Sequence, residues 1–548
     1  MATPLPFPGL SALLASYAKL FKSRQSYPLA DGGDRPTITA IIPALNEERT
    51  IPYALSSLAI QTVTPDRIIV VDDGSTDDTA TITRELDDEL DVSIEVWQHD
   101  EPMGKTVGVK EVARSVETDT LFVLDADTFL EADDYLERVL VPHIESDVAS
   151  SFGIAYPTET ASKREFHDDF SSDLLPAESI TRTHIEDDLD AAESRSGPLG
   201  YFRSNAPVVQ YRNVSYHVEQ RFFGDGFFRL FDSGLFPVGC AVMYDRAKLV
   251  SVFDDYEESL GNDLTNSEDI FIGFAFCDRG WKNVQVEDTY MRSDIPGLKR
   301  TFKQNYLWGS GFLQSAYYFK GLTTRYRKRK RETETEPNGS DGNRAEPESV
   351  DTETQSEPES VDTETQSEPE SVDTETQFEF DMDVKETDSG SESDTPDESD
   401  SPDSPAVTED ADRLVSAESN TDTDEATVDG ETERADSSSS DDDAASVQPP
   451  LGRAITARLI DGLYPTTILV FLVLSYFGVI GLEIVGFLVL WELTLYTVLV
   501  IATRSKRVHF ARNFVPFVLI RTMMMPVLTY TYLRVATDVV TGNRNWRK

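Results

Sequence analysis

Carboxylates and small polar residues stand at three points in the first quarter of the chain. They are Asn46-Glu47, Asp72-Asp73-Gly74-Ser75 and Asp125-Ala126-Asp127. A glycine-rich loop can cradle a phosphate directly, whereas carboxylates approach a phosphate through a divalent cation that both coordinate. The three groups therefore predict a site for a divalent metal and a phosphate-bearing ligand.

Each polar group follows a short apolar run, and the runs are Ile38–Ile42, Ile68–Val71 and Leu121–Leu124. Their β-branched composition is typical of strands buried on both faces of a parallel sheet. Helical stretches separate them, so the pattern is βαβαβ, with ligands expected at the carboxyl ends of the strands. Taken alone, the Asp-Ala-Asp motif is weak evidence for a metal site, because the chain has 99 acidic residues. Asn46-Glu47, taken alone, could simply cap the next helix. The order and spacing of all three favour a metal-dependent nucleotide-sugar enzyme.

The net charge of −50 is concentrated in one segment. Residues 332–447 hold 41 acidic and four basic residues, and they repeat the unit EPESVDTETQ three times with an 11-residue period. With few apolar residues to bury, this segment is expected to be disordered. We expect the basic cluster at 325–331 to contact anionic lipid, and a nuclear or nucleic-acid signal is the weaker alternative.

Other compositional features point to the compartment. The first 331 residues are also acidic, which suits a cytosol of high salt, where surface carboxylates keep proteins hydrated. The only cysteines are Cys240 and Cys277, which excludes a disulfide framework and favours a reducing compartment.

Apolar segments near the C-terminus predict membrane helices. Gly462–Leu482 contains 21 uncharged residues, enough to cross the hydrocarbon core, and Ile484–Thr503 follows with Glu492 inside it. A third stretch, Phe514–Leu533, carries Arg521 and two prolines, so both a crossing and a re-entrant course are open. Because a lone charge at membrane depth is costly, we expect Glu492 and Arg521 to pair.

Basic residues flank the start of the first span and the end of the second, which places those ends on the cytoplasmic side. Leu10–Phe21 is typical of an interfacial amphipathic helix and not of an export signal. We therefore expect a multi-pass protein of the cell membrane with a cytoplasmic catalytic domain. Its expected parts are an interfacial segment (1–36), a catalytic domain (37–320), a basic and acidic linker (321–450) and a membrane domain (451–548).

From about residue 37 to 310 the chain resembles the family 2 glycosyltransferases, especially the membrane-attached cellulose, chitin and hyaluronan synthase-like branch. The resemblance implies an α/β fold, a GT-A (nucleotide-diphospho-sugar transferase) Rossmann-like domain plus C-terminal transmembrane helices. In its acidic composition the chain also resembles haloarchaeal proteins.

On the donor side, the resemblance implies roles for the strand-end residues. Pro43, Asn46 and Glu47 would hold the nucleoside together with Asp72 or Asp73, and Gly104-Lys105 resembles a pair whose lysine faces the nucleotide. Asp125 and Asp127 match the metal motif, with Asp127 the more direct ligand of Mg²⁺ or Mn²⁺. The implied donor is a nucleotide-diphospho-sugar, with a UDP-sugar as the first choice.

On the acceptor side, Gly239-Cys240 resembles a glycine turn at which backbone approaches the acceptor, although a strand with a bulge glycine is an equal alternative. Glu268-Asp269 resembles the acidic pair that opens a helix, with Asp269 as general base. An aspartate near a helix N-terminus suits that role, and simple helix capping is the alternative.

The chain departs from the processive synthases after residue 303. Gln304 and Trp308 match their Gln-x-x-Arg-Trp motif, but Leu307 stands where they have the arginine that grips the diphosphate. Arg300 or Lys303 could substitute if the helix turns them inward. Trp308 would stack under the acceptor sugar, and a membrane-interface tryptophan is the alternative.

The expected activity is inverting transfer of a sugar from the nucleotide-diphospho-sugar to a hydroxyl of a lipid-linked glycan or polysaccharide at the cytoplasmic face. Membrane lipid is an expected partner, and nucleic acid is not. Two alternatives stay open. One is a dolichyl-phosphate sugar synthase, whose anionic acceptor needs no base, and the other is a non-catalytic membrane scaffold.

Overall fold

The computed structural model of the chain describes residues 9–27, 35–90, 92–171, 175–176, 178–194, 205–260, 268–323, 451–503, 508 and 510–541. The basic cluster at 325–331 and the acidic repeat lie outside the described residues, so the expectations about them stay predictions.

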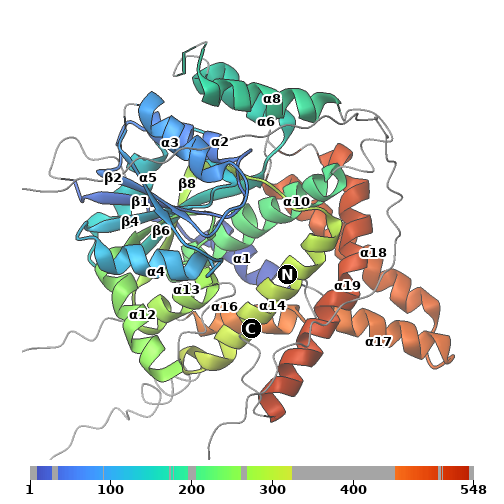
Figure 1. Cartoon of the computed structure of the whole chain (residues 1–548). Helices are drawn as coiled ribbons and strands as arrows, with labels where there is room; N and C mark the ends of the chain where they lie inside the picture. Colours follow the sequence, from blue (N-terminus) through green and yellow to red (C-terminus); the bar gives the residue numbers. More distant parts are fainter. Residues whose placement is uncertain are drawn as a thin grey trace, which may run out of the picture. The chain divides into compact units, whose positions relative to one another are not determined.

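Eight strands form one mixed sheet in the order β3-β2-β1-β4-β7-β6-β8-β5 (Figure 1). In chain order they are β1 (Ile38–Ala44), β2 (Arg67–Asp72), β3 (Ile94–Gln98), β4 (Thr120–Leu124), β5 (Thr128–Leu130), β6 (Val148–Pro157), β7 (Ala241–Asp245) and β8 (Lys282–Ser293). The first four pair in parallel, as the apolar runs predicted. β7 runs antiparallel between β4 and β6, so the second half of the sheet is mixed.

Both faces of the sheet are buried, because successive side chains of a strand point to opposite sides. Ile41 belongs to one apolar core and Ile42 to the other. Helices that contribute to the Ile41 core include α4 (Lys105–Ser115), α10 (Ala206–Val218), α12 (Arg246–Leu260) and α13 (Glu268–Asp278). Those of the Ile42 core include α2 (Ile51–Ala59), α3 (Thr79–Glu89), α5 (Tyr135–Leu140), α6 (Thr160–Phe166) and α8 (Ile180–Ser194).

The remaining elements are short helical turns within this domain, the helix that follows β8, and helices at or near the two ends of the described chain. They are α1 (Leu10–Phe21), η1 (Val141–Ile144), η2 (His167–Ser171), η3 (Glu219–Gly224), α11 (Asp225–Phe231), α14 (Leu298–Tyr318), α16 (Gly452–Asp461), α17 (Tyr464–Tyr476), α18 (Leu482–Thr503) and α19 (Phe510–Thr541).

Three segments of the described chain are long and apolar enough to cross a membrane: Gly452–Tyr476, Leu482–Thr503 and Ala511–Thr541. The first lies earlier than the expected 462–482, because α17 ends at Tyr476 and Gly478 adopts a left-handed backbone (φ 71°) in the turn to α18. The third is one continuous helix that contains both prolines.

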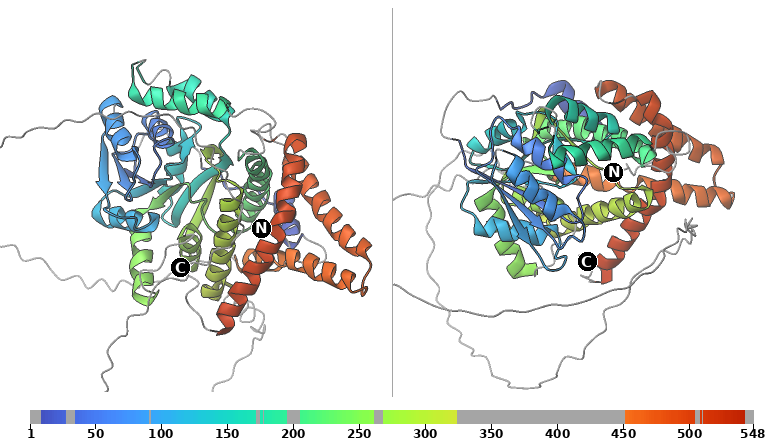
Figure 2. Two further views of the ribbon diagram at one scale, coloured as in Figure 1. Left: turned by 45° about the vertical axis from the view of Figure 1, so that its right-hand side comes forward. Right: turned by 45° about the horizontal axis from the view of Figure 1, so that its top comes forward.

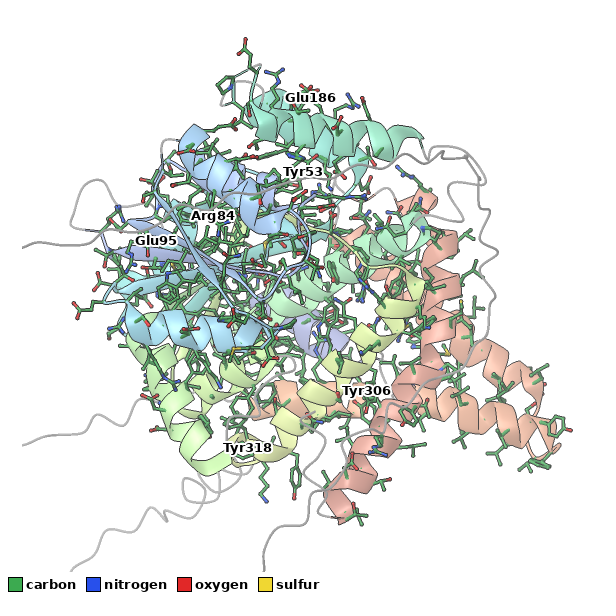
Figure 3. All side chains as sticks on the ribbon, in the orientation of Figure 1. Tyr53, Arg84, Glu95, Glu186, Tyr306 and Tyr318 are labelled. Atoms are coloured by element: carbon green, nitrogen blue, oxygen red, sulfur yellow. The ribbon has the colours of Figure 1, made fainter. Side chains whose placement is uncertain are left out.

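The apolar helices pack on the sheet domain through α10 and α14 (Figures 1 and 2). Tyr211 of α10 stacks on Phe517 of α19, with ring centroids 5.9 Å apart. The ring of Tyr306 in α14, labelled in Figure 3, has its centroid 5.8 Å from that of Tyr530 in α19. His217 of α10 contacts Thr503 Oγ1, at the end of α18, through Nε2 at 2.7 Å. α10 and α14, the second of which carries the predicted acceptor residues Gln304 and Trp308, therefore border the apolar helices directly.

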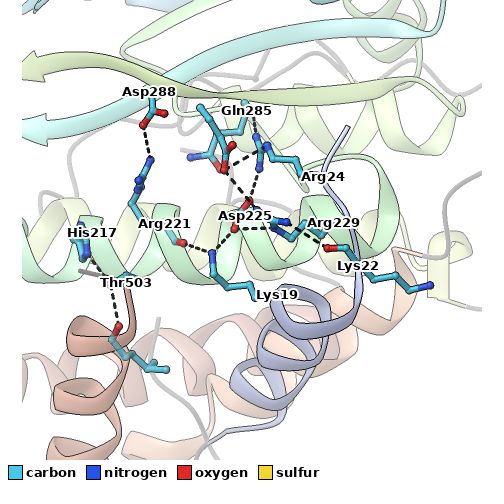
Figure 4. A network of polar contacts seen from close by, with 12 residues as sticks. Lys19, Lys22, Arg24, His217, Arg221, Asp225, Arg229, Gln285, Asp288 and Thr503 are labelled. Atoms are coloured by element: carbon cyan, nitrogen blue, oxygen red, sulfur yellow. Dashed lines mark hydrogen bonds and ion pairs between the residues drawn. The ribbon is translucent and has the colours of Figure 1, made fainter. Parts of the chain in front are cut away.

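The N-terminal helix α1 is held on the domain by a buried carboxylate. Asp225 contacts Lys19, Arg24 and Arg229, and Figure 4 shows these contacts. Burial alone would raise the pKa of Asp225, but the three cations outweigh it and lower the pKa. The opposite face of α1 exposes four large apolar side chains: Leu13, Tyr17, Leu20 and Phe21. This amphipathic pattern fits the interfacial helix expected from the sequence.

The expected pair inside the apolar helices is confirmed. Arg521 donates from Nη2 and Nε to Glu492 Oε1 at 2.9 and 3.1 Å, between α18 and α19. Both side chains are buried, with 6% and 2% exposed. The contact therefore joins the second and third apolar helices.

Glu492→Gln and Arg521→Gln should each lower thermal stability, because breaking a buried pair leaves one charge uncompensated at a cost of about 3–5 kcal/mol. The double variant should lose less than the sum of the single losses. Thermal unfolding in detergent measures this, with Glu483→Gln at the exposed start of α18 as the control. Strictly additive losses would show that the two side chains do not stabilise each other.

Candidate active site

The carboxyl ends of β1, β2 and β4 meet at one edge of the sheet, as the sequence predicted. Asp73 N donates to Ala44 O at 2.8 Å, which joins the first two strand ends. Asp125 N donates to Cys240 O at 2.9 Å, which joins the third to the turn before β7. Donor-side and acceptor-side residues thus share one site.

The Asn46-Glu47 group is held in place by hydrogen bonds to the segment that follows Asp72-Asp73-Gly74-Ser75. Asn46 has a left-handed backbone (φ 58°), which asparagine tolerates better than most residues. Its Oδ1 accepts from Thr76 N at 2.8 Å, and Glu47 N donates to Thr79 Oγ1 at 2.8 Å. The capping alternative is wrong, since the N-cap of α2 is Thr50 and no side chain caps it. Pro43 lies within β1, paired with Val71.

Both aspartates of the second group are buried and bonded within the protein. Asp72 accepts from Ser75 N at 3.0 Å and from Gln98 Nε2 at 2.9 Å. Asp73 accepts from the backbone N–H groups of Met103 and Gly104 at 2.8 and 2.7 Å. Asp73 therefore shapes the turn that leads into α4 and presents Lys105.

Lys105 is the centre of the site. Its Nζ lies 2.5 Å from Asp125 Oδ1, 3.0 Å from Gly239 O and 3.5 Å from Glu268 Oε1. Burial alone would lower the pKa of Lys105, but Asp125 and Glu268 outweigh it and raise the pKa well above its ordinary value. The ammonium therefore stays charged and links strand β4, the Gly239 turn and the start of α13.

Asp127 lies among further carboxylates. It accepts from Thr128 Oγ1 at 3.0 Å and from Ser293 Oγ at 3.4 Å. Burial raises its pKa to about 8, and Asp125, Glu47 and Asp294 add to the rise by repulsion. Negative charge accumulates here without a cation of the protein in contact with Asp127 among the described residues.

This charge balance fits a divalent cation. Within the described part of the chain, no three Asp, Glu, His or Cys side chains lie close enough together to hold a metal by themselves. Magnesium is commonly held by only one or two carboxylates together with substrate phosphates, and hard oxygen ligands are what Asp125 and Asp127 offer. The residues present therefore suit a metal whose remaining ligands come with the donor.

The general-base candidate sits against the glycine turn. Gly239 N donates to Asp269 Oδ2 at 3.2 Å, and a Cβ at Gly239 would come within 2.7 Å of that oxygen. Burial raises the pKa of Asp269 to about 7, with Glu268 adding to the rise. Glu268 and Asp269 open α13 as expected. Cys240, beside the turn, has a thiol pKa raised by burial and then by Asp125 and Asp127, so it is a neutral thiol.

Gln304 and Trp308 come together around a residue that the sequence analysis missed. Arg212 Nη2 donates to Gln304 Oε1 at 3.0 Å, and its guanidinium lies 4.7 Å from the Trp308 ring. Arg300 and Lys303 are exposed, so the condition under which either could substitute for the missing arginine is not met. The signal for Arg212 was a lone arginine within an otherwise uncharged helix, α10.

A pocket of about 430 Å³ adjoins the strand ends. Asn46, Glu47 and Asp294 line it, and the last two are among the groups that raise the pKa of Asp127. Sequence reasoning also missed Lys163, in the same pocket, whose Nζ lies 2.9 Å from Asp188 and 3.4 Å from Asp294. This hollow therefore adjoins carboxylates that act on Asp127 and has room for part of a donor.

Comparison with known proteins identifies the domain. Residues 39–252 match the family model described as glycosyl transferase family 2. An O-antigen chain rhamnosyltransferase of Salmonella typhimurium is 26% identical over 132 residues, 24% of this chain and 40% of that protein. A 4,4'-diaponeurosporenoate glycosyltransferase of Staphylococcus haemolyticus is 33% identical over 115 residues, 20% of this chain and 29% of that protein. The chain thus spans less than half the length of either relative.

Solved structures similar to this chain include two glycosyl-transferring enzymes. A mannosyltransferase from Pyrobaculum calidifontis, in complex with GDP-Man and Mn²⁺, is 17% identical with a TM-score of 0.38, over 56% of this chain and 72% of that one. Glucosyl-3-phosphoglycerate synthase from Mycobacterium tuberculosis, with Mn²⁺ and UDP, is 13% identical with a TM-score of 0.28, over 56% and 83%. Residues 39–252 are thus similar to glycosyl transferase family 2, and the mixed α/β sheet has the expected GT-A fold.

Proposed function

We propose that this protein is a membrane-bound inverting glycosyltransferase. It transfers a sugar from a nucleotide-diphospho-sugar to a saccharide hydroxyl of a lipid-linked glycan or polysaccharide. The observation that carries the proposal is the position of Lys105, which contacts Asp125 of the metal motif and Glu268 of the base motif at once. Metal pair and base therefore face one reaction centre.

The base motif has the chemistry that a hydroxyl acceptor requires. Asp269, with a pKa raised to about 7, is a stronger base than an ordinary aspartate. It takes the hydroxyl proton while the acceptor oxygen forms its bond to the anomeric carbon and the bond from that carbon to the diphosphate breaks. Attack opposite the leaving group inverts the configuration. An acceptor phosphate would already be anionic and would need no such base.

The donor side has the residues that a nucleotide-diphosphate needs. Asp127 and Asp125 would hold Mg²⁺ or Mn²⁺, which when bound neutralises charge on the departing diphosphate. The nucleoside would lie at the strand ends around Pro43, Asn46, Glu47, Asp72 and Asp73. A UDP-sugar is our first choice of donor.

We further propose that the catalytic domain faces the cytoplasm. The three apolar helices and the exposed apolar face of α1 support attachment to the cell membrane. Positive charges beside the apolar segments favour their cytoplasmic placement. Leu307 in place of the arginine of processive synthases favours few additions per acceptor over long polymerisation. The acidic surface suits a high-salt, haloarchaeal-type cytosol.

The alternatives differ in acceptor or in activity. A dolichyl-phosphate sugar synthase would glycosylate a lipid phosphate, and a membrane scaffold would not turn over donor. To separate the three, radiolabelled nucleotide-sugar is incubated with Mn²⁺ and either lipid phosphate or lipid-linked saccharide. Label on the saccharide supports the proposed transferase, label on the lipid phosphate supports the synthase, and no turnover of the donor supports the scaffold.

Asp269→Asn should slow transfer by about 10²-fold or more, because the amide cannot accept the hydroxyl proton, while donor binding stays near normal. Steady-state kinetics and nucleotide titration measure the two effects. Asp278→Asn, at the other end of α13, is the control. Full turnover by the Asp269 variant would refute the base assignment and favour a phosphate acceptor.

The pH profile of kcat/KM tests the same carboxylate. Since Asp269 must be ionised to accept a proton, activity should be lost as pH falls through about 7. The residual activity of Asp269→Asn should not show this loss at low pH. If the variant loses activity over the same pH range, another titrating group causes the loss.

Asp127→Asn should abolish transfer and weaken metal-dependent nucleotide binding, because the metal loses a charged ligand. Isothermal titration with UDP or GDP, with and without Mn²⁺, measures this. Asp133→Asn, in the loop after β5, is the control. Metal-dependent binding equal to that of the wild type would contradict the metal assignment.

Gly239→Ala should lower transfer by about tenfold or more, because the new methyl group would displace the Asp269 carboxylate and misplaced catalytic groups lose rate steeply. Gly297→Ala is the matched control, since a Cβ there meets nothing within 4 Å. Unchanged transfer by the Gly239 variant would show that this contact does not position the base.

A further inference from the structure

Arg212 is a buried cation in the middle of α10. Only 3% of the residue is exposed. The helix packs against β6 on one side and against α18 and α19 on another. The guanidinium therefore lies where the sheet domain meets the apolar helices.

Among the described residues, Arg212 contacts neutral groups. Nη2 donates to Gln304 Oε1, and the guanidinium lies 4.7 Å from the Trp308 ring and 5.3 Å from the Tyr216 ring. Its Nε is buried without a hydrogen-bond partner among the described residues. Aromatic faces stabilise a cation but supply no acceptor in the guanidinium plane for that N–H.

Three other buried cations in the described chain contact carboxylates. Arg458 pairs with Glu219, Lys163 with Asp188 and Asp294, and Arg521 with Glu492. An arginine cannot relieve its burial by losing a proton, and an unpaired buried charge is strongly disfavoured. Arg212 thus has a positive charge and an Nε–H without an acceptor, whereas each of those three cations has a carboxylate of the protein as its partner.

Arg212 is linked to the pocket through its neighbour on α10. Asn213 Nδ2 donates to Glu159 Oε1 at 2.6 Å, and Glu159 lines the pocket together with Asp294. Burial raises the pKa of the Tyr216 phenol, Arg212 opposes that rise, and Cys240 and Asp127 add to it. Tyr216 therefore interacts electrostatically with Arg212 and with both of these residues.

We propose that Arg212 is the binding residue of a phosphate subsite between the catalytic centre and the apolar helices, with Gln304 and Trp308 orienting its guanidinium. A phosphate oxygen matches both the positive charge and the free Nε–H, and the planar fork of arginine suits phosphate in particular. This rests on the proposed function, because that reaction brings phosphate to the site. The phosphate has two sources: the diphosphate of the donor, or a phosphate on the lipid-linked acceptor.

Binding to the full-length protein in detergent tests the subsite. The probes are UDP and GDP with Mn²⁺, their nucleosides, and a polyprenyl phosphate against the corresponding polyprenol. Arg212→Met should weaken one class of phosphate probe by about tenfold to a hundredfold, the range of a lost charged hydrogen bond, and leave the phosphate-free partner unchanged. Weaker nucleoside diphosphate binding assigns the donor as the source, and weaker polyprenyl phosphate binding assigns the acceptor.

Arg458→Met is the matched control, since it removes a buried arginine that already has a carboxylate partner. It should lower the unfolding temperature and leave discrimination between phosphate and phosphate-free probes intact. If Arg212→Met is not folded, Arg212→Gln, which retains hydrogen bonding, serves in its place. If the variant binds both classes of phosphate probe as tightly as the wild type does, the proposed subsite is overturned and the proposed function is not. If the wild-type protein binds neither class of phosphate probe, the proposed function is overturned as well.

Discussion

The ammonium of Lys105 holds three separate parts of the catalytic domain in one arrangement. It contacts the end of β4 through Asp125, the turn before β7 through Gly239 O and the start of α13 through Glu268. Without it, Asp125 and Glu268 would repel each other at the reaction centre. Since Asp73 shapes the turn that presents Lys105, the second strand end controls the geometry of the third. The sequence analysis predicted this lysine as a residue that faces the nucleotide, and the structure places it at the centre of the site.

Charge balance distinguishes structural clusters from the candidate functional ones. Asp225 is surrounded by Lys19, Arg24 and Arg229, and Glu492 is paired with Arg521. In both cases the buried charge is compensated by protein groups, and the cluster fixes one element on another. Asp127 has an excess of negative neighbours, while Arg212 contacts neutral groups among the described residues. Both Asp127 and Arg212 act electrostatically on Tyr216.

The junction between the sheet domain and the apolar helices is made by aromatic packing. α10 and α14 each contact α19, through Tyr211 and Phe517 and through Tyr306 and Tyr530. The same two helices carry Arg212, Gln304 and Trp308. Aromatic packing of this kind leaves the two parts little freedom to shift, so the acceptor-side residues keep their positions relative to the apolar helices.

The sequence alone determined the parallel strands β1, β2 and β4, the polar groups at their ends and the apolar C-terminal helices, because β-branched runs and long apolar stretches are local signals. It also predicted the pairing of Glu492 and Arg521, since an isolated charge is costly in an apolar segment. Only the tertiary structure decided that Arg300 and Lys303 face outward, that Gly239 seats Asp269, and that Arg212 meets Gln304 and Trp308. Those contacts join residues far apart in the chain, and their geometry depends on how helices pack on the sheet, which no local pattern encodes.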